Sequence, residues 1–239
     1  MDFDAYLDQV RQQAGALRAA AVKAGPDADV PTAPGWNVLK LVQHIARVHD
    51  WVVQALDVAP DADRPKADRP PEEWDALLAF WDARLDAMID GLRLRGPDEP
   101  AWAFGNPLGT TSFWARRQAH ETAIHRLDAE HAAHGDAVDH LVFEPEFAAD
   151  GIDEALTFMV PRRPIEVTGT VLFHAADAGR AWLVTAKAGE PPTVGPATEL
   201  ETDASVVGTA DAVYRAVWGR PSHAVVSGDK SIAAGLRTP

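Results

Sequence analysis

The stretch WARRQAHETAIHRLDAEHAAH, Trp114–His134, decides how the rest of the chain is interpreted. Glu121 and His125 lie four residues apart in it, so on a helix they would share one face. Trp114 begins a series of positions on that face, spaced alternately by four and three residues. The other members of the series are Gln118 and Asp128. Because a large apolar side chain heads the series, we predict that this face points inward.

A second stretch supplies a partner for these groups. PGWNVLKLVQHIARVHDWVVQAL, Pro34–Leu56, predicts a helix with Asn37 as its N-cap. His44 lies inside its apolar stripe, three residues after Leu41 and four before Val48. Packing the two helices together would bring this imidazole towards the carboxylate and imidazole of the first stretch.

A carboxylate and two imidazoles inside a helical bundle favour a divalent-metal site. Buried ionisable groups are costly unless they are paired or bind a metal. His44, Glu121 and His125 would form a three-ligand shell, and the open position that remains is typical of a catalytic site. Asp128, one turn beyond, would support His125 by a hydrogen bond or act as a base. The alternative is a chance E-x-x-x-H pair with His44 as a hydrogen-bonded core residue.

Five other histidines fall off both stripes. We therefore predict that they lie at the surface or at boundaries between elements. They are His49, His120, His131, His134 and His140.

The first part of the chain predicts a four-helix bundle. It contains four amphipathic segments of about 20 residues, joined by connections rich in Pro and Asp. The segments are Phe3–Gly25, Pro34–Leu56, about Pro71 to Leu92, and a fourth capped by Thr111 or Ser112. The aromatic residues around the last connection are candidates to line a pocket, and they are Trp102, Phe104 and Phe113.

After about Leu141 the pattern changes to β-branched alternation with short helices. The expected strands are Pro164–Ala175, Gly179–Ala186, Thr198–Gly208 and Ser222–Gly228, and the expected helices are Glu144–Val160 and Thr209–Gly219. The predicted fold class is therefore α+β with two domains, a helical bundle over residues 1–140 and a smaller α+β domain over residues 141–239.

Composition narrows the classes of function. The formal charge of −14 argues against nucleic acid as a partner. No apolar run approaches the roughly 20 residues of a membrane helix, and the N-terminus lacks the pattern of a signal peptide. We expect a cytoplasmic protein, monomeric or a small homo-oligomer, that acts on a small molecule. Cysteine is absent, so any thiol chemistry would need a thiol supplied from outside.

Three pieces of the chain, in this order, resemble one known family. They are PGWNVLKLVQHIARVHDW, WARRQAHETAIHRLDAE, and DASVVGTADAVYRAVWGR followed by VSGD. Together they resemble the mycothiol-dependent maleylpyruvate isomerase family, whose N-terminal domain is a DinB-like metal-binding four-helix bundle.

The resemblance implies both a site and a reaction. His44, Glu121 and His125 would bind the metal, with zinc the expected ion. Asp128 matches an acidic position of the motif, and Arg220 matches an arginine used near the active site, where it would bind a substrate carboxylate. Mycothiol or a similar low-molecular-weight thiol would serve as cofactor.

In the isomerase reaction the thiolate adds to the double bond of maleylpyruvate, the new single bond rotates, and elimination gives fumarylpyruvate. Two alternatives remain. A mycothiol S-transferase would stop at the adduct or displace a leaving group, and a metal-binding regulatory protein would keep the ion without turnover.

Overall fold

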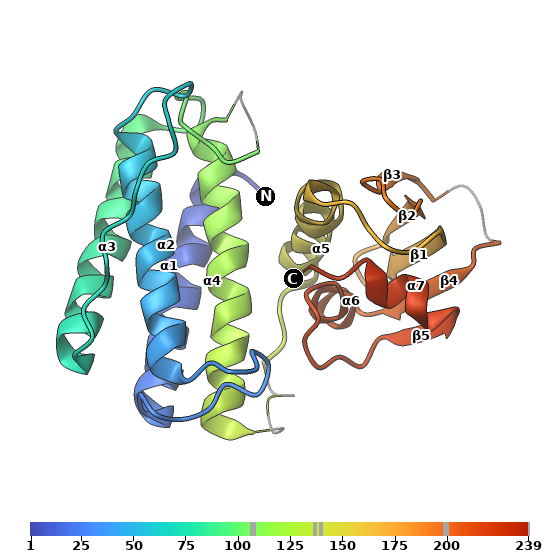
Figure 1. The fold of residues 1–239 in the computed structure, drawn as a ribbon, viewed down its shortest axis with the longest axis horizontal. Helices are drawn as coiled ribbons and strands as arrows, with labels where there is room; N and C mark the ends of the chain where they lie inside the picture. Colours follow the sequence, from blue (N-terminus) through green and yellow to red (C-terminus); the bar gives the residue numbers. More distant parts are fainter. Residues whose placement is uncertain (106–108, 136–137, 139–140, 198–200, 239) are drawn as a thin grey trace. The chain divides into compact units, whose positions relative to one another are not determined.

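The computed structural model describes residues 1–105, 109–135, 138, 141–197 and 201–238. The chain divides into two compact units, Met1–Leu141 and Val142–Pro239. The first is helical and the second combines helices with a sheet, which confirms the predicted α+β fold class with two domains (Figure 1). The long helices of the first unit are α1 (Phe3–Ala24), α2 (Val38–Leu56), α3 (Trp74–Arg95) and α4 (Thr111–His134).

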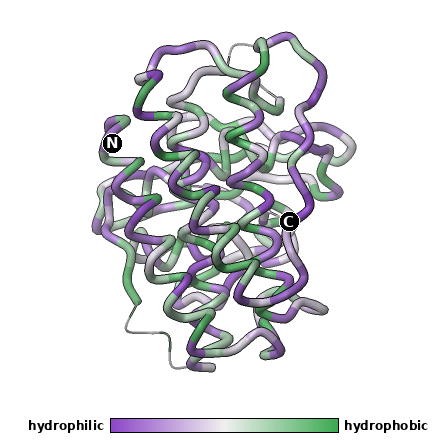
Figure 2. Tube along the Cα trace, turned by 90° about the vertical axis from the view of Figure 1, so that its left-hand side faces the viewer, coloured by the Kyte–Doolittle hydropathy of each residue, from purple (hydrophilic) through white to green (hydrophobic). Residues whose placement is uncertain are grey.

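These four helices pack side by side, with α1 mainly against α4 and α2 mainly against α3 (Figure 1). Hydrophobic and hydrophilic residues both occur along the turns of the helices (Figure 2). The stripe of α2 is fully buried at Leu41, Val42 and Ile45. Helix α2 also contacts α4, so the helix that carries His44 touches the helix that carries the other two predicted ligands.

Local capping explains where the helices begin. Asn37 caps α2 as predicted, because its side chain accepts a hydrogen bond from the backbone N of Lys40 at 3.0 Å. Helix α3 begins at Trp74 and not near Pro71, because the carboxylate of Glu73 caps it. The N-cap position of α4 is Thr110, next to the predicted Thr111, and its side chain makes no capping hydrogen bond.

Thr111 and Ser112, the predicted caps of α4, lie instead within its first turn. Their hydroxyls donate to backbone carbonyls of the preceding connection, those of Gly96 and Pro97. They therefore tie that connection to the start of α4.

The second unit contains one five-stranded sheet in the order β3-β2-β1-β4-β5. Strands β1 and β4 are parallel, and the other neighbouring pairs are antiparallel. Helices α6 and α7 pack against β1 and β4, and α5 packs against α6. The strands are β1 (Gly169–Ala175), β2 (Arg180–Ala186), β3 (Thr193–Pro196), β4 (Ala204–Gly208) and β5 (Val225–Gly228). The helices are α5 (Pro145–Glu154), α6 (Ala210–Val217) and α7 (Lys230–Gly235), and a π turn (Ala155–Met159) and a 3-10 turn (Val160–Arg162) follow α5.

The strand prediction for this unit was incomplete. The edge strand β3 was missed, because it has four residues and follows two prolines, which suits a sheet edge better than its interior. The strand predicted over Thr198–Gly208 is found only as β4, and residues 198–200 lie outside the described part of the chain. None of the helices in the described residues is long and apolar enough to span a membrane.

Candidate metal centre

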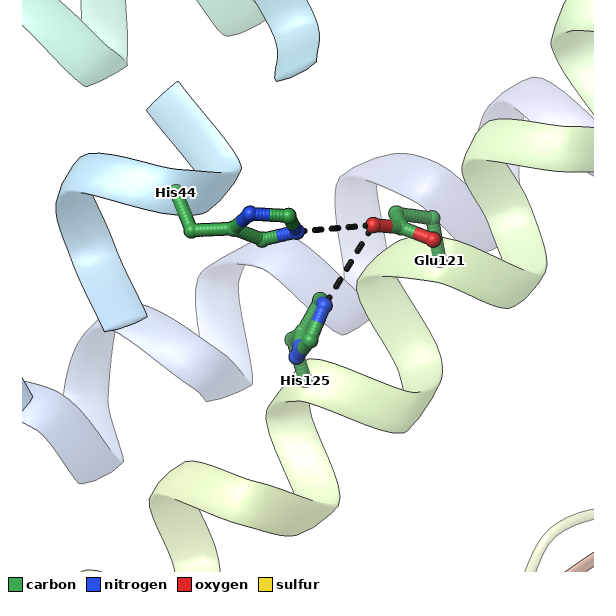
Figure 3. Close-up of side chains that lie close together, drawn as sticks. All are labelled: His44, Glu121 and His125. Atoms are coloured by element: carbon green, nitrogen blue, oxygen red, sulfur yellow. Dashed lines mark hydrogen bonds and ion pairs between the residues drawn. The ribbon is translucent and has the colours of Figure 1, made fainter. Parts of the chain in front are cut away.

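His44, Glu121 and His125 lie together, from the two helices that the sequence indicated (Figure 3). The Nε2 atom of His44 is 3.0 Å from Oε1 of Glu121, and Nε2 of His125 is 3.3 Å from the same oxygen. All three ligand atoms lie within 4.8 Å of one another. A tetrahedral ion with bonds of about 2.0–2.1 Å would separate its ligand atoms by about 3.3 Å. Both the spacing and the two-imidazole, one-carboxylate donor set therefore fit a zinc-type ion.

The carboxylate of Glu121 divides its two oxygens between different partners. Oε1 faces both histidines, while Oε2 accepts a hydrogen bond from Nη2 of the buried Arg117 at 2.9 Å. Burial raises the pKa of this carboxyl. The hydrogen bonds from His125 and His44, with the positive charge of Arg117, outweigh burial and hold the pKa well below its ordinary value. Glu121 is therefore ionised at neutral pH, as an anionic ligand must be.

The imidazole of His125 is oriented from its far side by Asp128. Its Nδ1 lies 2.9 Å from Oδ2 of Asp128, which is fully buried and also accepts a hydrogen bond from Thr32. Burial lowers the pKa of His125. The hydrogen bonds to Asp128 and Glu121, and the charges of those carboxylates, outweigh burial and raise the pKa to about 9. When an ion displaces the proton on Nε2, Asp128 would keep the other proton on Nδ1 and leave Nε2 as the ligand atom.

One side of the group is covered and the other is open. The side chain of His125 is 12% exposed and that of Glu121 is 17% exposed, whereas that of His44 is 34% exposed. The ring of Trp36 covers the histidines, with its centroid 5.1 Å from that of His44 and 6.3 Å from that of His125. Of the three side chains, His44 is therefore the one most accessible to a small molecule.

Three of the histidines predicted at the surface or at boundaries are in fact buried, namely His49, His120 and His131. Helix α2 contacts both α3 and α4, and α4 contacts both α1 and α2, so each buries more than one stripe. The prediction assumed a single stripe and was wrong for this reason. His134 is partly exposed, and His140 lies outside the described residues.

His49 and Arg117 are the residues near the site that the sequence interpretation missed. His49 accepts a hydrogen bond at Nδ1 from Trp81 Nε1 at 3.1 Å, and its Nε2 donates to the hydroxyl of Thr122, which follows Glu121. Burial lowers the pKa of His49 to about 3, so it stays neutral. The i, i+4 spacing of Arg117 and Glu121 was a visible signal for their ion pair.

Arg220 lies in the second unit, in the turn after α6. Its Nη1 donates to the backbone carbonyl of Trp218 at 2.6 Å, and its backbone N donates to the carbonyl of Arg215. Its side chain is half-buried. Binding of a substrate carboxylate by this residue stays a prediction.

Sequence profiles of two domains of one family match the chain. The mycothiol maleylpyruvate isomerase N-terminal domain matches residues 7–130, and the MDMPI C-terminal domain matches residues 146–235. The chain belongs to the mycothiol maleylpyruvate isomerase family. All three candidate ligands fall within the match to the N-terminal domain of this family, and Arg220 falls within the match to its C-terminal domain.

Solved structures of mycothiol-dependent maleylpyruvate isomerase share this fold. One is a crystal structure with 14% sequence identity, and another, of a histidine-to-alanine mutant, has 13% identity. In both comparisons the TM-score is 0.67, and the match covers 95% of this chain and 93% of the other. A search of curated proteins gave no match. The recognised family and the two-domain architecture are thus confirmed.

Proposed function

We propose that this protein is a metal-dependent enzyme that uses mycothiol or a similar thiol to isomerise a cis-enone acid of the maleylpyruvate type. The observation that supports this most is that the ligand atoms of His44, Glu121 and His125 lie close together in the bundle, where the side chain of His44 remains accessible to solvent. Its family, whose matched domains are those of mycothiol maleylpyruvate isomerase, agrees with that chemistry. Since the chain has no cysteine, it cannot supply the sulfur itself.

The proposed roles of the metal ligands and of Asp128 follow from their contacts, and that of Arg220 from the resemblance to the family. His44, Glu121 and His125 would hold the ion, with zinc expected. The bound ion would lower the pKa of an incoming thiol and keep it as the thiolate nucleophile. Asp128 fixes the ring of His125 by holding the proton at Nδ1. Arg220 would bind a carboxylate of the substrate through its guanidinium group.

A mycothiol S-transferase would use the same three ligands, so the site alone favours neither reaction. The fate of the thiol separates them, because an isomerase returns it and a transferase consumes it. A regulatory protein that only binds metal would do neither.

The test is to incubate the zinc-loaded protein with mycothiol and maleylpyruvate and to follow products and free thiol by NMR. We expect conversion to the trans isomer with no loss of thiol, and no conversion by His125→Ala. His134→Ala is the matched control, since it removes an imidazole from the same helix outside the candidate site. Stoichiometric thiol loss would instead identify a transferase. If mycothiol changes neither the products nor the amount of free thiol in the native protein, His125→Ala or His134→Ala, the site is not used for catalysis.

A further inference from the structure

Two cavities in the first unit share His44 and Arg47 in their lining. One, which we call the loop cavity, lies between α2 and the connection that follows it, and is lined by Arg47, Trp51, Arg64 and Lys66 among others. Its volume is about 670 Å³. The other, which we call the N-cap cavity, is about 690 Å³ and includes Lys40 and Arg69. Both lie within the range of about 300–1,000 Å³ that small-molecule sites occupy.

The charged residues that line the loop cavity, apart from His44, are all cations. They are Arg47, Arg64 and Lys66, and each is exposed to solvent. Within the described ranges of the chain none of the three forms an ion pair with a carboxylate. The chain carries a net charge of −14, so carboxylates are plentiful, yet none pairs with these three cations in the described residues.

Arg47 lines the N-cap cavity as well, but the two other cations of that cavity differ from Arg64 and Lys66. Lys40 donates to the carbonyl of Gly35 at 2.9 Å, and Arg69 pairs with Glu72, which also lines that cavity. Their hydrogen-bonding capacity is already partly used. Of the two cavities that meet at His44, the loop cavity therefore offers the stronger attraction to an anion.

The backbone that carries the loop cations is held in place on both sides of them. The fully buried carboxylate of Asp50 accepts a hydrogen bond from the backbone N of Asp68 at 2.6 Å. On the other side, Trp102 Nε1 donates to the carbonyl of Ala62 at 3.0 Å. Residues 64 and 66 lie between these two attachments, so the loop is ordered before any ligand arrives. Preorganisation of this kind lowers the entropic cost of binding.

Arg64 is restrained further by an aromatic surface. Its Cζ atom lies 4.6 Å from the centre of the Trp51 ring, a cation–π contact. Trp51 in turn packs against the aromatic rings of Trp102, Phe104 and Trp114. Trp102 and Phe104, which were expected to line a pocket, do not line this cavity. They pack instead against Trp51, which does line it. The guanidinium of Arg64 is held at the cavity wall and loses little freedom when it binds an anion.

We infer that the loop cavity is a subsite for one carboxylate group of the electrophilic substrate, with Arg64 and Lys66 as residues that determine specificity for anions. The inference deepens the proposed function and rests on it, because His44 joins this subsite to the candidate metal centre. It makes the preference for an anionic electrophile over a neutral one of the same shape depend on Arg64 and Lys66.

The test is a binding experiment on the zinc-loaded full chain without thiol, in which maleate and its neutral diamide are titrated by calorimetry. Maleate should bind, with an affinity that falls as salt rises, and the diamide should not. Loss of one charge-assisted hydrogen bond in Arg64→Gln or Lys66→Gln should weaken maleate binding about tenfold. Arg69→Gln, in the N-cap cavity, is the matched control and should change the affinity less than twofold.

Unchanged maleate affinity in both Arg64→Gln and Lys66→Gln would overturn the inference, since maleate would then be held by the metal alone. An equal loss in Arg69→Gln would also overturn it, because the effect would then reflect general charge. The titration uses no thiol and measures no turnover. Its result is therefore still valid if the protein does not catalyse the proposed reaction. Metal content measured in every variant checks that the candidate metal centre is intact.

Discussion

The two units of the molecule bury polar side chains to very different extents. In the described part of the chain, 14 polar or charged residues are buried, and only three of them belong to the second unit. These three are Glu154, Arg215 and Thr238. Helix α4 alone contributes eight. A buried polar group costs stability unless it is paired, so this concentration needs an explanation.

The difference indicates that α4 is organised around a site, whereas the second unit is organised around its sheet. In the second unit Arg215 pairs with Asp211 four residues earlier, which satisfies the charge locally. In α4 the buried Arg117 and Asp128 also pair within their own helix, but their partners are Glu121 and His125, the groups proposed to bind metal. The buried polar residues of α4 therefore support other side chains and not only the fold.

The largest expected effect is the loss of metal from Glu121→Ala. This variant removes the only anionic ligand, so we predict bound zinc well below one equivalent by elemental analysis. Glu130→Ala, which removes another buried carboxylate of α4, should keep full occupancy. Full occupancy in Glu121→Ala would show that the buried charges of α4 do not serve a metal.

A smaller effect is expected from Asp128→Asn. The amide keeps the shape of the side chain but no longer holds the proton on Nδ1 of His125 by charge. Loss of such a supporting partner typically weakens metal affinity about 10–100-fold. Chelator competition measures this change, and an affinity equal to that of the native protein would mean that Asp128 is merely structural.

The affinity for metal should increase as pH rises. Since the pKa of His125 is raised to about 9, its imidazole is protonated at neutral pH in the metal-free protein, and the ion must displace that proton. Affinity for zinc should therefore rise about tenfold per pH unit up to about pH 9. Proton release measured by calorimetry in buffers of different ionisation enthalpy tests this, and no release at pH 7 would contradict it.

The same pKa shift affects the stability of the metal-free bundle. A pKa raised above the unfolded value of about 6.5 stabilises the folded state fully below pH 6.5, and this contribution is lost as pH rises through about 9. The free energy of unfolding of the metal-free protein, measured with urea, should be lower at pH 9.5 than at pH 6. This difference between the two pH values should be smaller in His125→Leu.

The smallest effect on metal binding is expected from Arg220→Ala. Because Arg220 lies in the second unit, zinc content should stay at the native value while KM for an acidic substrate rises about tenfold. Steady-state kinetics and elemental analysis on the same preparation check both parts. Loss of metal would instead assign Arg220 a structural role.

Much of the candidate site was predictable because it depends on helical spacing. The four-residue separation of Glu121 and His125, and the place of His44 in an apolar stripe, are visible in the sequence. The same periodicity predicted the four helices. That the carboxylate of Glu121 is shared between the two imidazoles and the buried Arg117 was missed, although the i, i+4 spacing of Arg117 and Glu121 was a signal for it.

What the sequence did not reveal depends on contacts between distant segments. His49 and His120 are polar and lie off the main stripes, yet α2 and α4 each pack on more than one neighbour and bury them. Strand β3 has too few residues to show alternation and exists because β2 pairs with it. The loop cavity likewise depends on Asp50 and Trp102, which hold the connection after α2 from outside it.

The most direct test of the account is zinc K-edge X-ray absorption on the loaded protein, with and without mycothiol. Nitrogen and oxygen neighbours from two imidazoles and one carboxylate should be present throughout, and mycothiol should add one sulfur neighbour at about 2.3 Å. A spectrum that excess mycothiol leaves unchanged, or that is the same in His44→Ala, would contradict thiol activation by a metal held between α2 and α4.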